Sequence, residues 1–416
     1  MGPDQTVTGT ATVTEANDSS LALIDSGFII NSDNPAIGYV LASAFNSDDS
    51  LAYVAVGNRG YSDSQGNVLN NGTVQILFSG SDILSGSGSL STTNLNGNPD
   101  GVLITGITDA GDNNRNLSLS LATGDIDGDG VPDLVIGAPN VGNFAGAVYV
   151  IYGSYLNSQK GQTIDVGNVN LKPNNIGFAI NGSNADDLAG FSVVVGNFDG
   201  DSYGDIVYGA PYAKDSNGNR VGQVYLVPGS AQEGTPNSSV IYTGKSFDIP
   251  NPQPNPPSPT LTVGEGAGFA LGVSRRLTGT NSPSTFTGST TTDDLFIGAP
   301  NYQIQVANQW TNQSNLPGQN SQNKQNQQIT SDLFPSSSYV SAGAVYVYNS
   351  NQGLSLNTNP WAIYTGPTIP NAQGTATSYF AGTVVGSGLN MDLDGDGRQD
   401  LVIAGLKLIP TRGRPL

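Results

Sequence analysis

The chain has 416 residues, with 33 acidic and 14 basic side chains and no cysteine or histidine. These absences exclude disulfides, thiolate and imidazole metal sites, cysteine nucleophiles and Ser-His-Asp triads. The formal net charge of -19 makes nucleic acids and anionic membranes unfavourable partners and favours the binding of cations.

An internal repeat runs through the chain and is marked by an apolar run that ends in Gly-Ala-Pro. The motif occurs as DLVIGAP (133–139), DIVYGAP (205–211) and DLFIGAP (294–300), and in degenerate form as AYVAVGN (52–58) and DLVIAG (400–405). The aligned glycines are 80, 72, 89 and 107 residues apart. This spacing predicts about five repeat units.

Each complete unit contains four short runs that are rich in valine, isoleucine, tyrosine and phenylalanine and are bounded by glycine, asparagine, aspartate or proline. Such runs predict β-strands. The units span approximately residues 36–106, 117–183, 189–244, 267–366 and 379–405. Repeated sets of four strands predict an all-β fold, a β-propeller of four-stranded antiparallel blades forming one domain over residues 1–416. An array of β-sandwiches is the alternative.

Three segments interrupt this pattern. Residues 1–34 are predicted to supply the outer strands of a composite or preceding blade, because the fifth unit shows only its two inner strands. The chain would then form either a closed five-bladed ring or a fragment of a larger propeller. Residues 250–259 (PNPQPNPPSP) are predicted to be an extended linker, and residues 303–338 a Gln/Asn-rich loop insertion at the surface.

Three nine-residue windows precede the second, third and fifth copies of the motif: DIDGDGVPD (125–133), NFDGDSYGD (197–205) and DLDGDGRQD (392–400). Aspartate or asparagine stands at the first place, aspartate at the third, fifth and ninth, and glycine at the fourth. Alternate short carboxylates converge when a backbone curls around a hard cation with six or seven oxygen ligands, and a main-chain carbonyl at the seventh place completes the set. Calcium fits this set better than magnesium, which keeps several waters.

The sequence therefore predicts three calcium sites, with five ligand residues in each loop. The predicted ligands are Asp125, Asp127, Asp129, Val131 and Asp133 in the first loop, Asn197, Asp199, Asp201, Tyr203 and Asp205 in the second, and Asp392, Asp394, Asp396, Arg398 and Asp400 in the third.

Two alternatives to this loop type were weighed. An EF-hand requires a glutamate at the twelfth place and flanking helices, but isoleucine or tyrosine stands there in all three copies. Asp-Gly turns in tight hairpins without metal are the second alternative. The fourth unit keeps only Asp294, and the first offers only Ser47 and Asp49, so these two units are predicted not to bind calcium.

The run AGFSVVVGNFDGDSYGDIVYGAP (189–211) resembles the FG-GAP repeat of integrin α-subunit β-propellers and their bacterial relatives. The resemblance implies a propeller with calcium in hairpin loops on one face, an extracellular or cell-surface location, and a role in adhesion or partner binding. The chain departs from the family pattern in its longer units, its five copies in place of seven, and the two units that lack the loop.

The function that follows is a calcium-binding adhesion or interaction module, with calcium structural and a protein or glycan ligand on the face opposite the loops. The longest insertion on that face contains Tyr302, Trp310, Phe334 and Tyr339. Nucleic-acid binding is not expected, because the net charge is negative. Membrane insertion is not expected either, because no apolar run approaches the roughly 18 residues of a membrane span. We do not expect an enzyme. The alternative is a propeller domain of, or accessory to, a secreted hydrolase or lyase.

Overall fold

The computed structural model describes most of the predicted repeats. The described residues are 40–47, 50–58, 61–62, 68–70, 72–79, 101–107, 120–167, 171, 176–231, 238–249, 261–274, 292–306, 338–348, 354, 359–360, 362–365, 369–370, 376–377, 379–386 and 402–407. Residues 1–34, the linker at 250–259 and most of the Gln/Asn-rich segment lie outside the described residues, so the predictions made for them stay predictions.

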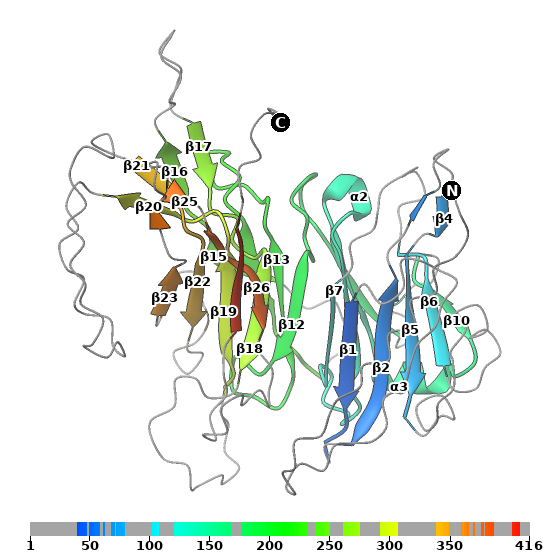
Figure 1. The fold of residues 1–416 in the computed structure, drawn as a ribbon. Coiled ribbons are helices and arrows are strands. Elements are labelled where there is room, and N and C mark those ends of the chain that lie inside the picture. Colours follow the sequence, from blue (N-terminus) through cyan, green and yellow to red (C-terminus); the bar gives the residue numbers. More distant parts are fainter. Residues whose placement is uncertain are drawn as a thin grey trace, which may run out of the picture.

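Four sheets of four or five strands follow one another along the chain (Figure 1). The first sheet contains β1 (Val40–Phe45), β2 (Leu51–Asn58), β5 (Thr73–Phe78), β6 (Gly101–Thr105) and β10 (Thr163–Asp165). The second contains β7 (Ser120–Gly124), β8 (Asp133–Ala138), β9 (Ala147–Ile151) and β11 (Gly177–Asn181). The third contains β12 (Ser192–Gly196), β13 (Asp205–Ala210), β14 (Gln223–Val227) and β15 (Ser239–Thr243). The fourth contains β18 (Ala270–Ser274), β19 (Asp294–Ala299), β22 (Ala344–Tyr348) and β23 (Ala362–Thr365).

Within each of these sheets, consecutive strands of the repeat pair in antiparallel order. A further antiparallel pair is formed by β26 (Tyr379–Gly386) and β27 (Val402–Lys407). The first strands β1, β7, β12, β18 and β26 contact one another in this order, so the sheets stand side by side in chain order. The expected all-β fold of repeated four-stranded antiparallel sheets is confirmed.

Short elements connect the main strands. The hairpins are β3 (Tyr61–Ser62) with β4 (Val68–Asn70), β16 (Ser246–Ile249) with β17 (Leu261–Gly264), β20 (Gln303–Val306) with β21 (Ser338–Ser341), and β24 (Ile369–Pro370) with β25 (Ala376–Thr377). The short helices are α2 (Val141–Phe144) and α3 (Gly153–Ser158). Among the described residues, no helix has the length and apolar character that crossing a membrane requires.

The first sheet departs from the four-strand expectation, because β10 adds a fifth strand at its outer edge. This strand lies between α3 and β11 in the chain and pairs in parallel with β6, with Ile164 opposite Ile104. Both isoleucines are buried. A segment from the second repeat unit therefore covers the edge of the sheet that the first unit builds.

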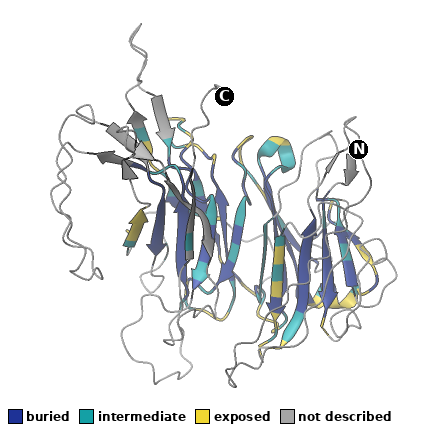
Figure 2. Cartoon of the chain, viewed as in Figure 1, coloured by how far each residue is buried: buried dark blue, intermediate teal, exposed yellow. Residues whose placement is uncertain are grey.

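The core lies between neighbouring sheets. Because the central strands are covered on both faces, their sequences are continuous apolar runs and do not alternate between apolar and polar residues. Leu134 and Ile136 of β8 belong to the cluster shared with the first sheet, whereas Val135 belongs to the cluster shared with the third. All six residues of β8 are buried. A strand covered on both faces is typically a continuous apolar run. Figure 2 shows this burial in the second and third strands of the sheets, with exposed residues on β1 and β23.

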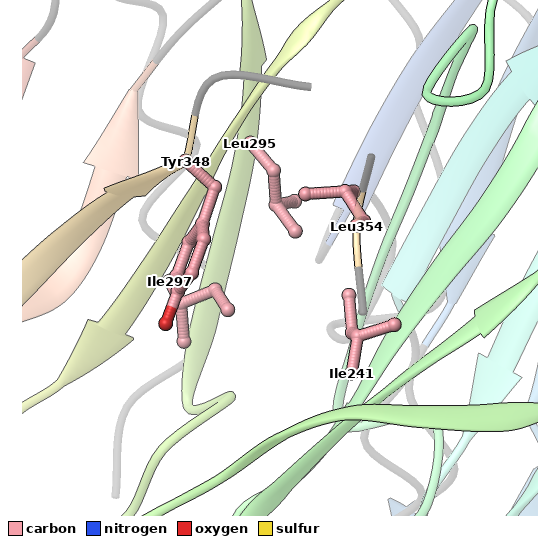
Figure 3. Close-up of a pocket in the computed structure, with 5 residues that line it drawn as sticks. All are labelled: Ile241, Leu295, Ile297, Tyr348 and Leu354. Atoms are coloured by element: carbon pink, nitrogen blue, oxygen red, sulfur yellow. The ribbon is translucent and has the colours of Figure 1, made fainter. Parts of the chain in front are cut away.

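The cluster between the third and fourth sheets contains a small apolar pocket (Figure 3). It is lined by Ile241, Leu295, Ile297, Tyr348 and Leu354. None of these side chains is a carboxylate or an amine, so the pocket offers packing contacts and no paired acid and base.

Candidate metal centre

The first two Asp loops occupy equivalent hairpins in successive sheets. Residues 125–133 connect β7 to β8, and residues 197–205 connect β12 to β13. In both cases the ninth-place aspartate is the first residue of the following strand. Paired strands therefore hold each loop at both ends. The third loop, residues 392–400, lies outside the described residues, so its site stays a prediction.

The first loop curls around its own carboxylates. Asp125 accepts hydrogen bonds from the main-chain N–H groups of Gly128 (2.8 Å) and Gly130 (3.0 Å), and Asp127 accepts one from the residue two places on (3.2 Å). Gly128 has a φ of 77°, a left-handed conformation that glycine adopts without a steric cost. As a result, carboxylate oxygens of Asp125, Asp127 and Asp133 lie within 4.8 Å of one another.

The second loop repeats this arrangement with one chemical difference. Asn197 accepts a hydrogen bond from the N–H group of Gly200 (2.7 Å) with its Oδ1 atom, while its Nδ2 atom donates to the carbonyl of Asp201 (2.6 Å). An amide has one acceptor atom and one donor atom, whereas Asp125 receives its two N–H groups on two separate carboxylate oxygens. Carboxylate oxygens of Asp199, Asp201 and Asp205 again lie within 4.8 Å of one another.

The ninth-place aspartates are the buried members of the two triads. Asp133 has no exposed surface, and its two oxygens accept hydrogen bonds from the N–H groups of Ile126 (2.8 Å) and Gly153 (2.7 Å). The equivalent donors to the buried Asp205 are the N–H groups of Phe198 (2.7 Å) and Gly229 (2.9 Å). Each ninth-place carboxylate therefore joins its loop to a glycine two residues beyond the end of the third strand of its sheet.

The clustering of carboxylates disfavours their charged forms. Burial, together with the charges of Asp127 and Asp125, raises the pKa of Asp133 to about 8 against the opposing effect of its two N–H donors. Burial likewise raises the pKa of Asp205 to about 6. The pKa values of Asp127 and Asp201 are also raised, first by burial and then by neighbouring carboxylates. A cation would relieve this repulsion, and donor sets made only of oxygen suit calcium, magnesium or manganese.

The triads contain six of the ligands that the sequence predicts. The fifth-place Asp129 is outside the first triad and accepts a hydrogen bond from the N–H group of Val131 (2.7 Å). Tyr203 likewise donates its N–H group to Asp201 (2.7 Å). Sequence reasoning missed the role of Gly153 and Gly229. The signal was available, because a glycine stands two residues after the third strand in both units, at the end of GAVYVIYG and GQVYLVPG.

The FG-GAP repeat model matches residues 119–151 and 189–227, and each match contains one Asp loop with the strands on either side. The chain carries FG-GAP repeats. These FG-GAP repeats identify the second and third sheets as propeller blades, and we use the word blade for the first to fourth sheets from here on.

Similarity to named proteins covers only part of each of those proteins. The chain is 30% identical over 181 residues to the phosphatidylinositol-glycan-specific phospholipase D of Mus musculus, which is 42% of this chain and 18% of the mouse protein. This chain thus spans less than a fifth of that relative. Among solved structures, the rhamnogalacturonan lyase PL11 of Bacillus licheniformis aligns with 90% of this chain and 55% of its own, at 11% identity and a TM-score of 0.26. A likeness at that level carries no argument about fold or activity.

Proposed function

We propose that the chain is a calcium-stabilised β-propeller module, placed outside the cell, that binds a protein or glycan partner. The observation that carries the proposal is the equivalence of the two described Asp loops. Both combine three converging carboxylates, a glycine with positive φ at the fourth place, and a buried ninth-place aspartate that accepts main-chain N–H groups from its own loop and from the segment after the third strand. The third and ninth places contribute to both triads, and a recurring cluster of carboxylate oxygens is the donor set that a hard cation requires.

The residues of each loop have separate tasks in this proposal. The triad carboxylates would hold the cation together with the carbonyl at the seventh place, while the loop N–H groups orient the carboxylates. These carboxylates stand at the first, third and ninth places of the first loop and at the third, fifth and ninth places of the second. Calcium would supply the positive charge that offsets the repulsion among the clustered carboxylates. The buried Asp133 and Asp205 give up their protons on binding, because a ligating carboxylate must be ionised.

The partner surface is the face opposite the Asp loops. The loops connect first to second strands, whereas β3–β4, α2 and β20–β21 connect second to third strands and gather at one end of the sheets (Figure 1). Successive connections of a meander leave a sheet at alternate ends, which places these insertions away from the loops. The exposed Tyr212 lies on the corresponding connection of the third blade, with the guanidinium of Arg220 5.8 Å from its ring.

The deciding experiment is calorimetric titration of chelator-stripped protein with calcium and, separately, with magnesium. We expect three calcium ions per chain and weaker binding of magnesium. The variant Asp127→Asn should remove one ion. The control Asp215→Asn makes the same carboxylate-to-amide change outside the Asp loops and should remove none. A stoichiometry of zero for calcium would refute the proposal.

A second candidate is an accessory domain of a secreted hydrolase, favoured by the 181-residue similarity to a protein named as a phospholipase D. The chain would then bind the substrate of a separate catalytic domain. Incubation of the purified chain with a glycosylated phosphatidylinositol tests this idea. Binding without hydrolysis supports the accessory role, and the absence of binding contradicts it.

A further inference from the structure

The two described Asp loops contact each other across the boundary between the second and third blades. The carbonyl of Asp125, at the first place of one loop, accepts a hydrogen bond from the N–H group of Gly204, at the eighth place of the next (2.6 Å). Gly128 lies against the ring of Tyr203, where an added Cβ atom would come within 2.4 Å of the ring. The hydrogen bond thus connects a member of the first triad, Asp125, to Gly204, the residue just before Asp205 of the second triad.

A second path joins the two buried ninth-place carboxylates. Ile126 donates its N–H group to Asp133, and its carbonyl accepts a hydrogen bond from the N–H group of Ser230 (3.0 Å). The preceding residue, Gly229, donates its N–H group to Asp205. The position of one buried carboxylate is thus connected to that of the other through three hydrogen bonds and the single peptide unit between residues 229 and 230.

The next blade boundary shows that the loop-to-loop contact belongs to the architecture. Asn197, at the first place of the second loop, accepts a hydrogen bond with its carbonyl from the N–H group of Asp293 (2.7 Å). Asp293 stands at the eighth place of the fourth blade, which keeps the ninth-place Asp294 but has no carboxylate at the first, third or fifth place. The boundary between the second and third blades therefore differs from this one in having a carboxylate triad on both sides.

We propose that these contacts make calcium binding at the two loops positively cooperative, an inference that rests on the proposed calcium function. An occupied first loop holds Asp133 and Ile126 in place, and Ile126 in turn holds the 229–230 segment that positions Asp205. The second loop then loses less conformational entropy when it binds calcium. A smaller entropy loss at the second binding step is a recognised source of positive coupling. Coupling of this kind typically changes affinity by about 5- to 150-fold.

Charge opposes this coupling only weakly. The first loop has four carboxylates and the second has three, so each loop remains negative with one divalent ion bound. At physiological ionic strength the screening length is about 8 Å, which reduces repulsion between the two ions. Ordering is therefore expected to determine the sign of the coupling.

The test measures the calcium affinity of the second loop by calorimetry with the first loop intact or disabled by Asp127→Asn. All variants also carry Asp394→Asn, which removes the third predicted loop from the titration. The measurement is made in two backgrounds. Ser230→Pro removes the N–H group that bonds to Ile126, and Ser230→Ala keeps it. The carboxylate lost in Asp127→Asn is the same in both backgrounds, so any difference between them reports the hydrogen-bonded path.

In the Ser230→Ala background we expect Asp127→Asn to weaken calcium binding at the second loop by at least five-fold. In the Ser230→Pro background the weakening should be less than half as large. Equal weakening in both backgrounds would overturn the coupling while leaving the calcium sites in place. No calcium binding in the unmodified chain would instead overturn the proposed function. If thermal melting shows that Ser230→Pro does not fold, Tyr203→Ala replaces it, because it removes the ring against Gly128 and keeps every loop N–H group.

Discussion

Gly137 lies so close to the main-chain carbonyl of Gly190 that a Cβ atom on Gly137 would come within 2.1 Å of that oxygen. The two residues belong to neighbouring blades. The same approach recurs at the next boundary, where a Cβ atom on Gly209 would come within 2.0 Å of the carbonyl oxygen of Gly268. The glycine of the Gly-Ala-Pro motif is therefore a point of close backbone approach between successive blades.

We expect Gly137→Ala and Gly209→Ala each to lower the free energy of unfolding by about 2 kcal/mol, because the added carbon forces two backbones apart in a packed interior. Gly218→Ala is the control. Gly218 has a φ of 84° and open space around it, so its substitution should cost about 1 kcal/mol from backbone conformation alone. Urea denaturation measures the three values. Equal losses for all three would mean that the approach between blades does not constrain the motif.

Removal of calcium should lower the melting temperature. A ligand that binds only the folded state stabilises it by about 2.7 kcal/mol per site at a hundredfold excess over Kd. Differential scanning calorimetry with calcium or chelator measures the shift. The variant Asp127→Asn should show a smaller shift than the unmodified chain, since one site is lost. A melting temperature that is the same in calcium and in chelator would contradict bound structural calcium.

The ninth-place aspartates should matter to folding even without calcium. Asp133→Ala leaves the buried N–H groups of Ile126 and Gly153 without their acceptor, and each such loss costs about 1–3 kcal/mol. Asp129→Ala is the control in the same loop, because Asp129 is exposed and accepts one N–H group. We expect Asp133→Ala to be the more destabilising by at least about 2 kcal/mol in calcium-free buffer, measured by chemical denaturation.

The raised pKa values predict a pH dependence of stability that is present without calcium and absent with it. In the calcium-free protein, folded Asp133 keeps its proton up to a pKa of about 8, whereas the unfolded chain loses it near pH 4. The folded state binds more protons in this window, so stability falls as pH rises from about 4 to 8, with a slope near 1.4 kcal/mol per pH unit. Asp205 adds to the slope up to its pKa of about 6.

With saturating calcium the ion replaces these protons, and the fall in stability should disappear. Denaturation at pH 5 and pH 8, with and without calcium, measures both slopes. A calcium-free protein that is more stable at pH 8 than at pH 5 would show that the ninth-place carboxylates are ionised without an ion.

A buried glutamate joins the third and fourth blades on the side of β16 and β17. Glu265 has no exposed surface and accepts hydrogen bonds from the hydroxyls of Tyr242 (2.6 Å) and Tyr346 (2.7 Å). Tyr346→Phe should cost about 1–3 kcal/mol, because one carboxylate oxygen then loses its buried donor. The control Tyr225→Phe removes a hydroxyl at the same place in the third blade, where the partner is the half-buried Gln223, and should cost less. Similar losses in both variants would argue against a special contribution of the hydrogen bonds to Glu265.

The strands and the Asp loops could be predicted because their signals are local. β8 and β13 are buried on both faces and so are continuous apolar runs, and the loop carboxylates sit at fixed places beside a glycine with positive φ. The Glu265 cluster could not be predicted in this way. Its two tyrosines lie 23 and 81 residues away in the sequence, and neither separation follows from the repeat. β10 was missed because three residues of mixed character carry no periodic pattern.

The parallel pairing of β10 with β6 determines when the first sheet can be completed during synthesis. Chains emerge from the ribosome with the N-terminal residues first, at roughly 5–20 residues per second. The first sheet must therefore wait for residues 163–165, which are made about 60 residues after its fourth strand, before its outer edge is covered. Until then the nascent chain exposes a strand edge that can pair with another copy. A chain truncated before residue 163 should accordingly aggregate where the longer chain stays dispersed.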